Sequence, residues 1–193
     1  MLASGSPRRL VLLGQIGYAP RVVVPDVDET PQEGETPRAL VRRLATTKAR
    51  AISLAADEVA LAADTVIDLD GRVLGKPRDR AEGIAMLRAL ARREHRVLSG
   101  LCIRREHVAH TVIVTTRVRF GAVSEAEAAR YWDGGEPRGK AGGYAVQGEG
   151  ARFVASLRGS YSNVVGLPLY ETARLLAAVG VEPSAGARSA SET

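Results

Sequence analysis

The sequence predicts an α/β fold built on a mixed, strongly twisted sheet. Residues 40–45 carry apolar side chains at helical spacing, whereas residues 59–69 form an apolar run suited to a buried strand. The turn signal Asp70-Gly71 leads that strand directly into residues 72–74. Because helices and strands intermix and some strands are joined by tight turns, a mixed sheet flanked by helices is favoured over a purely parallel one.

The remaining elements follow from periodicity and from start signals. Pro7 after Ser6 starts a helix, and Ser124 with Glu127 forms a capping box for another. Residues 134–150 are rich in glycine and predict a loop. The expected helices span about residues 7–17, 36–54, 80–91, 124–133 and 167–179. The expected strands span about residues 21–24, 59–69, 72–74, 95–104, 111–123 and 151–157.

Length and composition indicate a globular chain of 193 residues, 45% of them hydrophobic. We expect one domain over residues 1–182, as a single core or a core with two lobes, and a disordered tail over residues 183–193. The single cysteine, Cys102, excludes an internal disulfide. No secretory signal and no apolar run of about 18 residues is evident, so we expect a soluble, cytoplasmic protein without a membrane partner.

The charge balance narrows the classes of partner. The net charge of +5 is compatible with nucleic acid, an acidic surface or small phosphorylated substrates. The arginines are scattered, and two Phe and one Trp offer no stacking platform, so no nucleic-acid partner is expected. Of the 27 basic residues, only Lys48, Lys76 and Lys140 are lysines. These three lysines were kept either because their positions need a compact ammonium group or by chance, and composition alone favours neither explanation.

The first candidate site is the turn that contains Ser4, Ser6, Arg8 and Arg9. A helix N-terminus offers free backbone N–H groups and a favourable dipole for an anion. The two hydroxyls and two guanidinium groups suit phosphate oxygens. Taken alone, the same pattern also fits an ordinary helix start with solvated arginines.

The second candidate is Asp64, which lies within the apolar strand 59–69. A carboxylate there is costly unless it is paired, coordinated or hydrogen-bonded. It is either a metal ligand or general base, or an aspartate bound to backbone. Asp26, Asp28 and Glu29 in an acidic loop could supply a second carboxylate, although such loops are often simply solvated.

Three further side chains could meet a ligand. Lys48 lies late on the second expected helix, and Lys76 lies in the turn Gly75-Lys76-Pro77 after the hairpin. Gln147 offers an amide beside flexible backbone, which could bind a nucleotide base or pack on the core. Taken alone, each lysine fits an ordinary surface position better than a ligand-binding one.

In combination these segments resemble the Maf family of nucleotide pyrophosphatases. The matching segments occur in the family's order, and any one of them is short. They are residues 2–9, 28–29, 48–49, 63–66, 75–77, 95–100 and 139–168. The ordered set spans nearly the whole chain and is highly specific.

The resemblance implies a fold and a chemistry. The fold would be like that of inosine triphosphate pyrophosphatases, with a long mixed sheet, two lobes and a central cleft. The reaction would be metal-assisted attack of water on the α-phosphate, with Mg²⁺ or Mn²⁺ as cofactor. Asp64 would be the catalytic proton acceptor, and Glu29 with Asp64 would lie at the metal. The positions implied to hold phosphates are Ser4, Arg8, Arg9, Lys48 and Lys76.

The resemblance also implies a substrate. Arg8, Thr65 and Gln147 match positions that mark the subgroup acting on dTTP and UTP, so these nucleotides, together with modified pyrimidine nucleotides, are expected. Roles in nucleotide-pool cleaning and cell-division arrest, and a homodimer, would follow. One alternative is the same chemistry on purine or modified nucleotides. The other is a protein that binds nucleic acid or a division partner, with vestigial catalysis.

Overall fold

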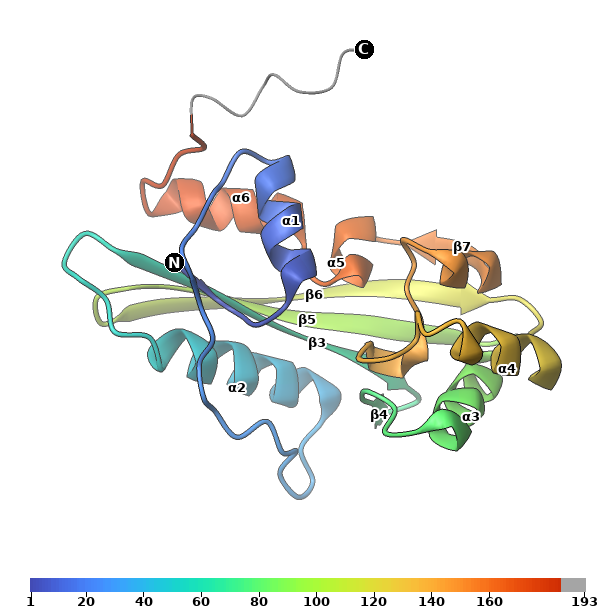
Figure 1. Cartoon of the computed structure of the whole chain (residues 1–193). Coiled ribbons are helices and arrows are strands. Elements are labelled where there is room, and N and C mark those ends of the chain that lie inside the picture. Colours follow the sequence, from blue (N-terminus) through green and yellow to red (C-terminus); the bar gives the residue numbers. More distant parts are fainter. Residues whose placement is uncertain (185–193) are drawn as a thin grey trace, which may run out of the picture. The chain divides into compact units, whose positions relative to one another are not determined.

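The structure is a computed structural model that describes residues 1–184, so most of the predicted tail, residues 185–193, lies outside the described residues. The strands are β1 (Leu2–Ala3), β2 (Val22–Val23), β3 (Val59–Leu69), β4 (Arg72–Leu74), β5 (Glu94–Arg105), β6 (Val108–Phe120) and β7 (Val154–Arg158) (Figure 1). The helices are α1 (Pro7–Gln15), α2 (Pro37–Arg50), α3 (Arg80–Leu90), α4 (Glu125–Asp133), α5 (Tyr161–Val165) and α6 (Leu169–Ala178). Within residues 1–184, no helix is long and apolar enough to cross a membrane.

The strands form a seven-stranded sheet in the order β2-β1-β3-β5-β6-β7, with β4 paired to β3. Strand β1 is parallel to both of its neighbours, and Leu2 lies opposite Val22 and Leu61. The pairs β3–β4 and β6–β7 are antiparallel. The predicted mixed sheet flanked by helices is therefore confirmed, and β3 begins and ends at the predicted residues.

The described chain divides into two compact units. Unit 1 comprises Met1–Asp64, Ser99–Val114 and the chain from Gly166 onward, and unit 2 comprises Thr65–Leu98 and Thr115–Val165. Strands β3, β5 and β6 contribute residues to both units. The two units correspond to the two lobes expected from the family resemblance, whereas the central cleft stays a prediction.

In unit 1, helices cover both faces of the sheet: α2 lies on one face, and α1 and α6 lie on the other (Figure 1). Small side chains, among them Ala45, Ala49 and Ala62, fill the core beneath α2. A Cβ atom added to Gly100 of β5 would lie 2.1 Å from the backbone oxygen of Val41. Helix α2 can therefore approach the sheet this closely only because residue 100 is glycine.

Helix α2 starts as predicted but ends earlier than residue 54. Thr36 caps its N-terminus by accepting a hydrogen bond from the Ala39 N–H (3.2 Å). Arg104 of β5 donates from Nε to the carbonyl oxygen of Ala49 (2.9 Å) and from Nη2 to that of Ile52. Because this side chain satisfies carbonyl groups at the helix C-terminus, the chain can leave the helix there. That contact depends on tertiary structure, which periodicity does not reveal.

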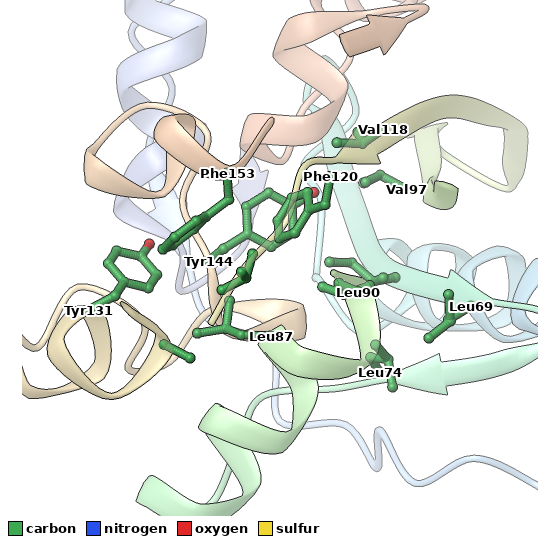
Figure 2. Packing of buried hydrophobic residues seen from close by; sticks show 13 residues of the cluster. Leu69, Leu74, Leu87, Leu90, Val97, Val118, Phe120, Tyr131, Tyr144 and Phe153 are labelled. Atoms are coloured by element: carbon green, nitrogen blue, oxygen red, sulfur yellow. The ribbon is translucent and has the colours of Figure 1, made fainter. Parts of the chain in front are cut away.

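The core of unit 2 gathers leucine and aromatic side chains around α3 and β6 (Figure 2). The rings of Phe120 and Tyr144 meet edge to face with their centroids 4.8 Å apart. Tyr131 of α4 meets Phe153 in the same way at 5.2 Å. Such pairs add specific geometry to the area that they bury. This core therefore attaches the glycine-rich segment, which contains Tyr144, to the sheet.

Two short elements differ from the sequence-based expectation. Residues 149–153 form a 3-10 turn, so β7 begins at Val154 and not at residue 151. Helix α5, with five residues, was not expected. Its Asn163 is buried and donates from Nδ2 to the Val97 carbonyl (3.1 Å) and to Thr116 Oγ1 (3.0 Å). These tertiary hydrogen bonds hold a segment that is too short to be a stable helix alone.

His95 of β5 predicts a pH dependence of stability. The ring is buried, its Nε2 lies 2.8 Å from the Tyr144 hydroxyl, and burial lowers its pKa from 6.5 to about 4. The unfolded chain thus binds a proton that the folded chain excludes, and stability is lost as pH falls from 6.5 towards 4. Between pH 7 and pH 5 we expect this group to remove about 2 kcal/mol of unfolding free energy.

Urea unfolding of the wild type and of His95→Gln at both pH values measures that contribution. The variant should lose clearly less stability on acidification, because glutamine does not titrate. Equal losses in the two proteins would show that His95 is not the responsible group.

Candidate active site

The turn between β1 and α1 is organised by the hydroxyl of Ser4. Its Oγ accepts hydrogen bonds from the Ser6 N–H (3.1 Å) and from Arg9 Nη1 (3.0 Å). Ser6 occupies the N-cap position, but within residues 1–184 its side chain makes no capping hydrogen bond, contrary to the simplest expectation. Ser4 is buried. The side chain that holds this turn is thus one that the family resemblance implied to bind phosphate.

Arg9 is a buried, fixed cation on the first turn of α1. Besides its bond to Ser4, its Nε donates to the carbonyl oxygen of Gly166 (2.9 Å), which belongs to the same unit. Burial lowers the pKa of the guanidinium, the negative charge of Asp64 opposes that shift, and the half-buried Arg8 adds to it. Because an arginine guanidinium stays protonated in proteins, Arg9 is a cation within electrostatic range of Asp64.

Lys48 joins the two acidic candidates. From the last turns of α2, its Nζ lies 2.6 Å from Asp64 Oδ1 and 2.7 Å from Glu29 Oε1. The side chains of Lys48 and Asp64 are 8% and 10% exposed, whereas that of Glu29 is 54% exposed. One ammonium thus faces a buried carboxylate from the sheet and an open carboxylate from the acidic loop.

The acidic loop contributes Glu29 and not its other two candidates. Asp28 accepts a hydrogen bond from the Thr30 N–H (2.9 Å). Hydrogen bonds from the Thr30 side chain and, to a lesser extent, from this N–H lower the pKa of Asp28. Asp26 is exposed. Glu29, at the family position, is therefore the acidic residue of this loop that forms an ion pair with Lys48.

Glu29 and Asp64 fit a magnesium-type ion. Two carboxylates that already face one cation could bind another, and Mg²⁺ usually takes one or two carboxylates together with substrate phosphates. The described part of the chain contains no group of three or more His, Cys, Asp or Glu side chains placed for a metal. Phosphate oxygens of a substrate, together with water, would complete the coordination.

Three predicted residues belong to unit 2. Thr65 follows Asp64 on β3, and Lys76 is exposed in the loop after β4. The carbonyl of Gly75 beside it accepts a hydrogen bond from the Gly142 N–H (2.9 Å). Gln147 is exposed in the glycine-rich segment. That Thr65, Lys76 and Gln147 act together with the site residues of unit 1 stays a prediction.

Two contributors escaped the sequence analysis. Gly166 holds Arg9 through a backbone oxygen, which leaves no side-chain signal in the sequence. Glu136 accepts hydrogen bonds from the backbone N–H groups of Glu149 (3.0 Å) and Gly150 (3.0 Å), and thereby anchors the segment that carries Gln147. Its position between two glycines and a proline resembled an ordinary solvated turn.

Comparisons with known proteins cover nearly the whole chain. A family model described as Maf-like protein matches residues 1–179. A dTTP/UTP pyrophosphatase of Vibrio cholerae is 48% identical over 178 residues, covering 91% of this chain and 95% of the relative. One of Anaeromyxobacter dehalogenans is 52% identical over 184 residues, covering 93% of each. The solved structure of a nucleoside-triphosphatase (dITP/XTP pyrophosphatase) of Mycobacterium abscessus covers 92% of this chain and 95% of its own, with 17% identity and a TM-score of 0.43.

Proposed function

The chain belongs to the Maf-like protein family, and we propose that it hydrolyses dTTP and UTP to the nucleoside monophosphate and pyrophosphate. Relatives at 48% and 52% identity are named dTTP/UTP pyrophosphatases, which supports this substrate class. The observation that carries the proposal is Lys48, buried between the carboxylates of Asp64 and Glu29 beside a fixed arginine. Such a cluster suits a reaction in which charged phosphates are bound and attacked.

Cationic side chains and a hydroxyl group would bind the triphosphate. Arg9 has its Nε and one Nη committed to the protein, so its guanidinium is oriented before substrate arrives. Oriented donors stabilise developing phosphate charge without reorganising during the reaction. Ser4 and Arg8 at the same turn, with Lys48 and Lys76, would bind the remaining phosphate oxygens.

Asp64 acts as the general base in the hydrolytic step. A water oxygen attacks the α-phosphorus, its proton passes to the Asp64 carboxylate, and the bond to the bridging oxygen breaks. The electron pair of that bond leaves with pyrophosphate, so the products are a nucleoside monophosphate and pyrophosphate. Lys48 holds the carboxylate by a 2.6 Å contact and thereby fixes its direction.

Glu29 and Asp64 would hold the divalent cation, Mg²⁺ or Mn²⁺, which neutralises charge on the phosphate oxygens. Arg8, Thr65 and Gln147 would select the base and its neighbouring groups. A polar site that hydrogen-bonds the correct base rejects others because its own groups would be left unpaired. A cytoplasmic homodimer is part of the same proposal.

The test is pyrophosphate release from a panel of nucleoside triphosphates in the presence of Mg²⁺. We expect dTTP and UTP to be the best substrates and to be preferred over purine triphosphates by at least about 100-fold in kcat/KM. Preference for a purine nucleotide would leave the chemistry intact but contradict the proposed substrates. Absence of turnover on every nucleotide, with Mg²⁺ and with Mn²⁺, would contradict the enzyme itself.

A further inference from the structure

Glu136 lies just after α4 and gathers four polar groups of unit 2. Its Oε1 accepts hydrogen bonds from the Tyr131 hydroxyl (2.5 Å) and from the Gly150 N–H (3.0 Å). Its Oε2 accepts one from the Glu149 N–H (3.0 Å). Its backbone carbonyl accepts one from Lys140 Nζ. A carboxylate that receives three hydrogen-bond donors is a strong local anchor.

Tyr131 extends the anchor to the other end of the same segment. Its ring is buried in the core of unit 2 (Figure 2), and its hydroxyl accepts a hydrogen bond from the Ala145 N–H (3.0 Å) while donating to Glu136. The pair therefore holds residue 145 at one end and residues 149 and 150 at the other. The exposed Gln147 lies between these two attachments.

Close approach of the backbone shows how tightly the pair holds the segment. A Cβ atom at Gly148 would lie 2.0 Å from Glu136 Oε2, and one at Gly150 would lie 2.5 Å from the Tyr131 hydroxyl oxygen. Both positions thus require glycine for contact with the anchor and not only for flexibility. Any side chain at residue 148 or 150 would disturb the contact with Glu136 or Tyr131.

The charge state of Glu136 suits this role. Burial raises its pKa, but the hydrogen bonds from Tyr131 and from the Gly150 and Glu149 N–H groups outweigh that effect and bring the pKa below the usual range. The carboxylate is therefore ionised at neutral pH and offers acceptor oxygens to all three donors.

We propose that Glu136, supported by Tyr131, is the positioning residue for base selection, because it fixes the backbone on which Gln147 is presented. This inference rests on the proposed function, in which Gln147 reads the pyrimidine base. Glu136 acts through the segment and does not itself touch the substrate. Its loss should therefore change which nucleotide is preferred more than it changes the rate of the hydrolytic step.

The test compares Glu136→Gln and Tyr131→Phe with Asp133→Asn, a control on α4 whose exposed carboxylate forms an ion pair with Arg80 (2.8 Å). Glutamine places an NH₂ group against a backbone N–H donor, so one hydrogen bond becomes a repulsion. For Glu136→Gln we expect KM for dTTP to rise about tenfold and the preference for dTTP over dATP to fall about tenfold, with kcat changed less than about threefold. Tyr131→Phe should change the same quantities in the same direction but less, and the control should match the wild type.

Hydrogen exchange at the amides of residues 145, 149 and 150 gives a second readout that needs no turnover. These amides should exchange faster in both variants and not in the control. An unchanged KM and base preference in a folded Glu136→Gln variant overturns the inference, and so does a uniform fall of kcat on all nucleotides. If Glu136→Gln does not fold, Tyr131→Phe decides by the same criteria.

Wild-type turnover separates this inference from the proposed function. If the wild type prefers dTTP and UTP and the variants keep that preference, only the role of Glu136 is refuted. If the wild type hydrolyses neither nucleotide, the proposed function fails first and the role of Glu136 in base selection fails with it.

Discussion

Replacement of Asp64 by asparagine is expected to lower the turnover of dTTP by about 100-fold or more while the protein remains folded. Removal of a general base typically costs a factor of this size. Asparagine has nearly the same shape and can still accept a hydrogen bond from Lys48, whose ammonium keeps its contact with Glu29 (2.7 Å). The loss should appear in kcat, because the missing base acts on the attacking water, and the amide oxygen of asparagine can still serve as a ligand to the cation.

The matched control is Asp57→Asn, an exposed aspartate that precedes the same strand. Steady-state kinetics of the three proteins, with circular dichroism as a check on folding, make the comparison. Turnover of Asp64→Asn within a few-fold of the wild type would remove Asp64 from the role of base.

Replacement of Lys48 by methionine is expected to affect both activity and stability. The substitution keeps most of the apolar stem but leaves Asp64, 10% exposed, without the ammonium that contacts it at 2.6 Å. Breaking a buried ion pair from one side typically costs about 3 kcal/mol or more. Loss of a cation that stabilises phosphate charge should also lower kcat/KM for dTTP by about 100-fold.

Thermal unfolding in the presence of a chelator and then of Mg²⁺ distinguishes the two effects. Because Glu29 and Asp64 would face each other without Lys48, Mg²⁺ should raise the melting temperature of Lys48→Met more than that of the wild type. Arg42→Met on the exposed face of α2 is the control and should behave as the wild type. Equal responses to Mg²⁺ in all three proteins would speak against a metal site at these carboxylates.

Some features of the fold were predictable because one physical signal determined them. The apolar side chains of residues 59–69 are readily buried by a strand inside a sheet, and β3 has the expected bounds. The Ser124–Glu127 capping box is also present, with both of its reciprocal bonds. Local chemistry alone specified these elements, so sequence analysis placed them correctly.

Other features depend on contacts between distant segments and could not be predicted. The end of α2 depends on Arg104, and α5 depends on the hydrogen bonds of Asn163 to β5 and β6. In the candidate site, the order of motifs pointed to Lys48, Glu29 and Asp64 separately. That one ammonium contacts both carboxylates is a property of three-dimensional structure, since these residues come from a helix, a loop and a strand.

The most direct measurement of the central claim follows the oxygen atom of the attacking water. Hydrolysis of dTTP in water enriched in oxygen-18 should place the heavy atom in dTMP and leave pyrophosphate unlabelled, because water attacks the α-phosphorus and pyrophosphate leaves with the bridging oxygen. Label in pyrophosphate, or release of single phosphate groups in its place, would contradict the account.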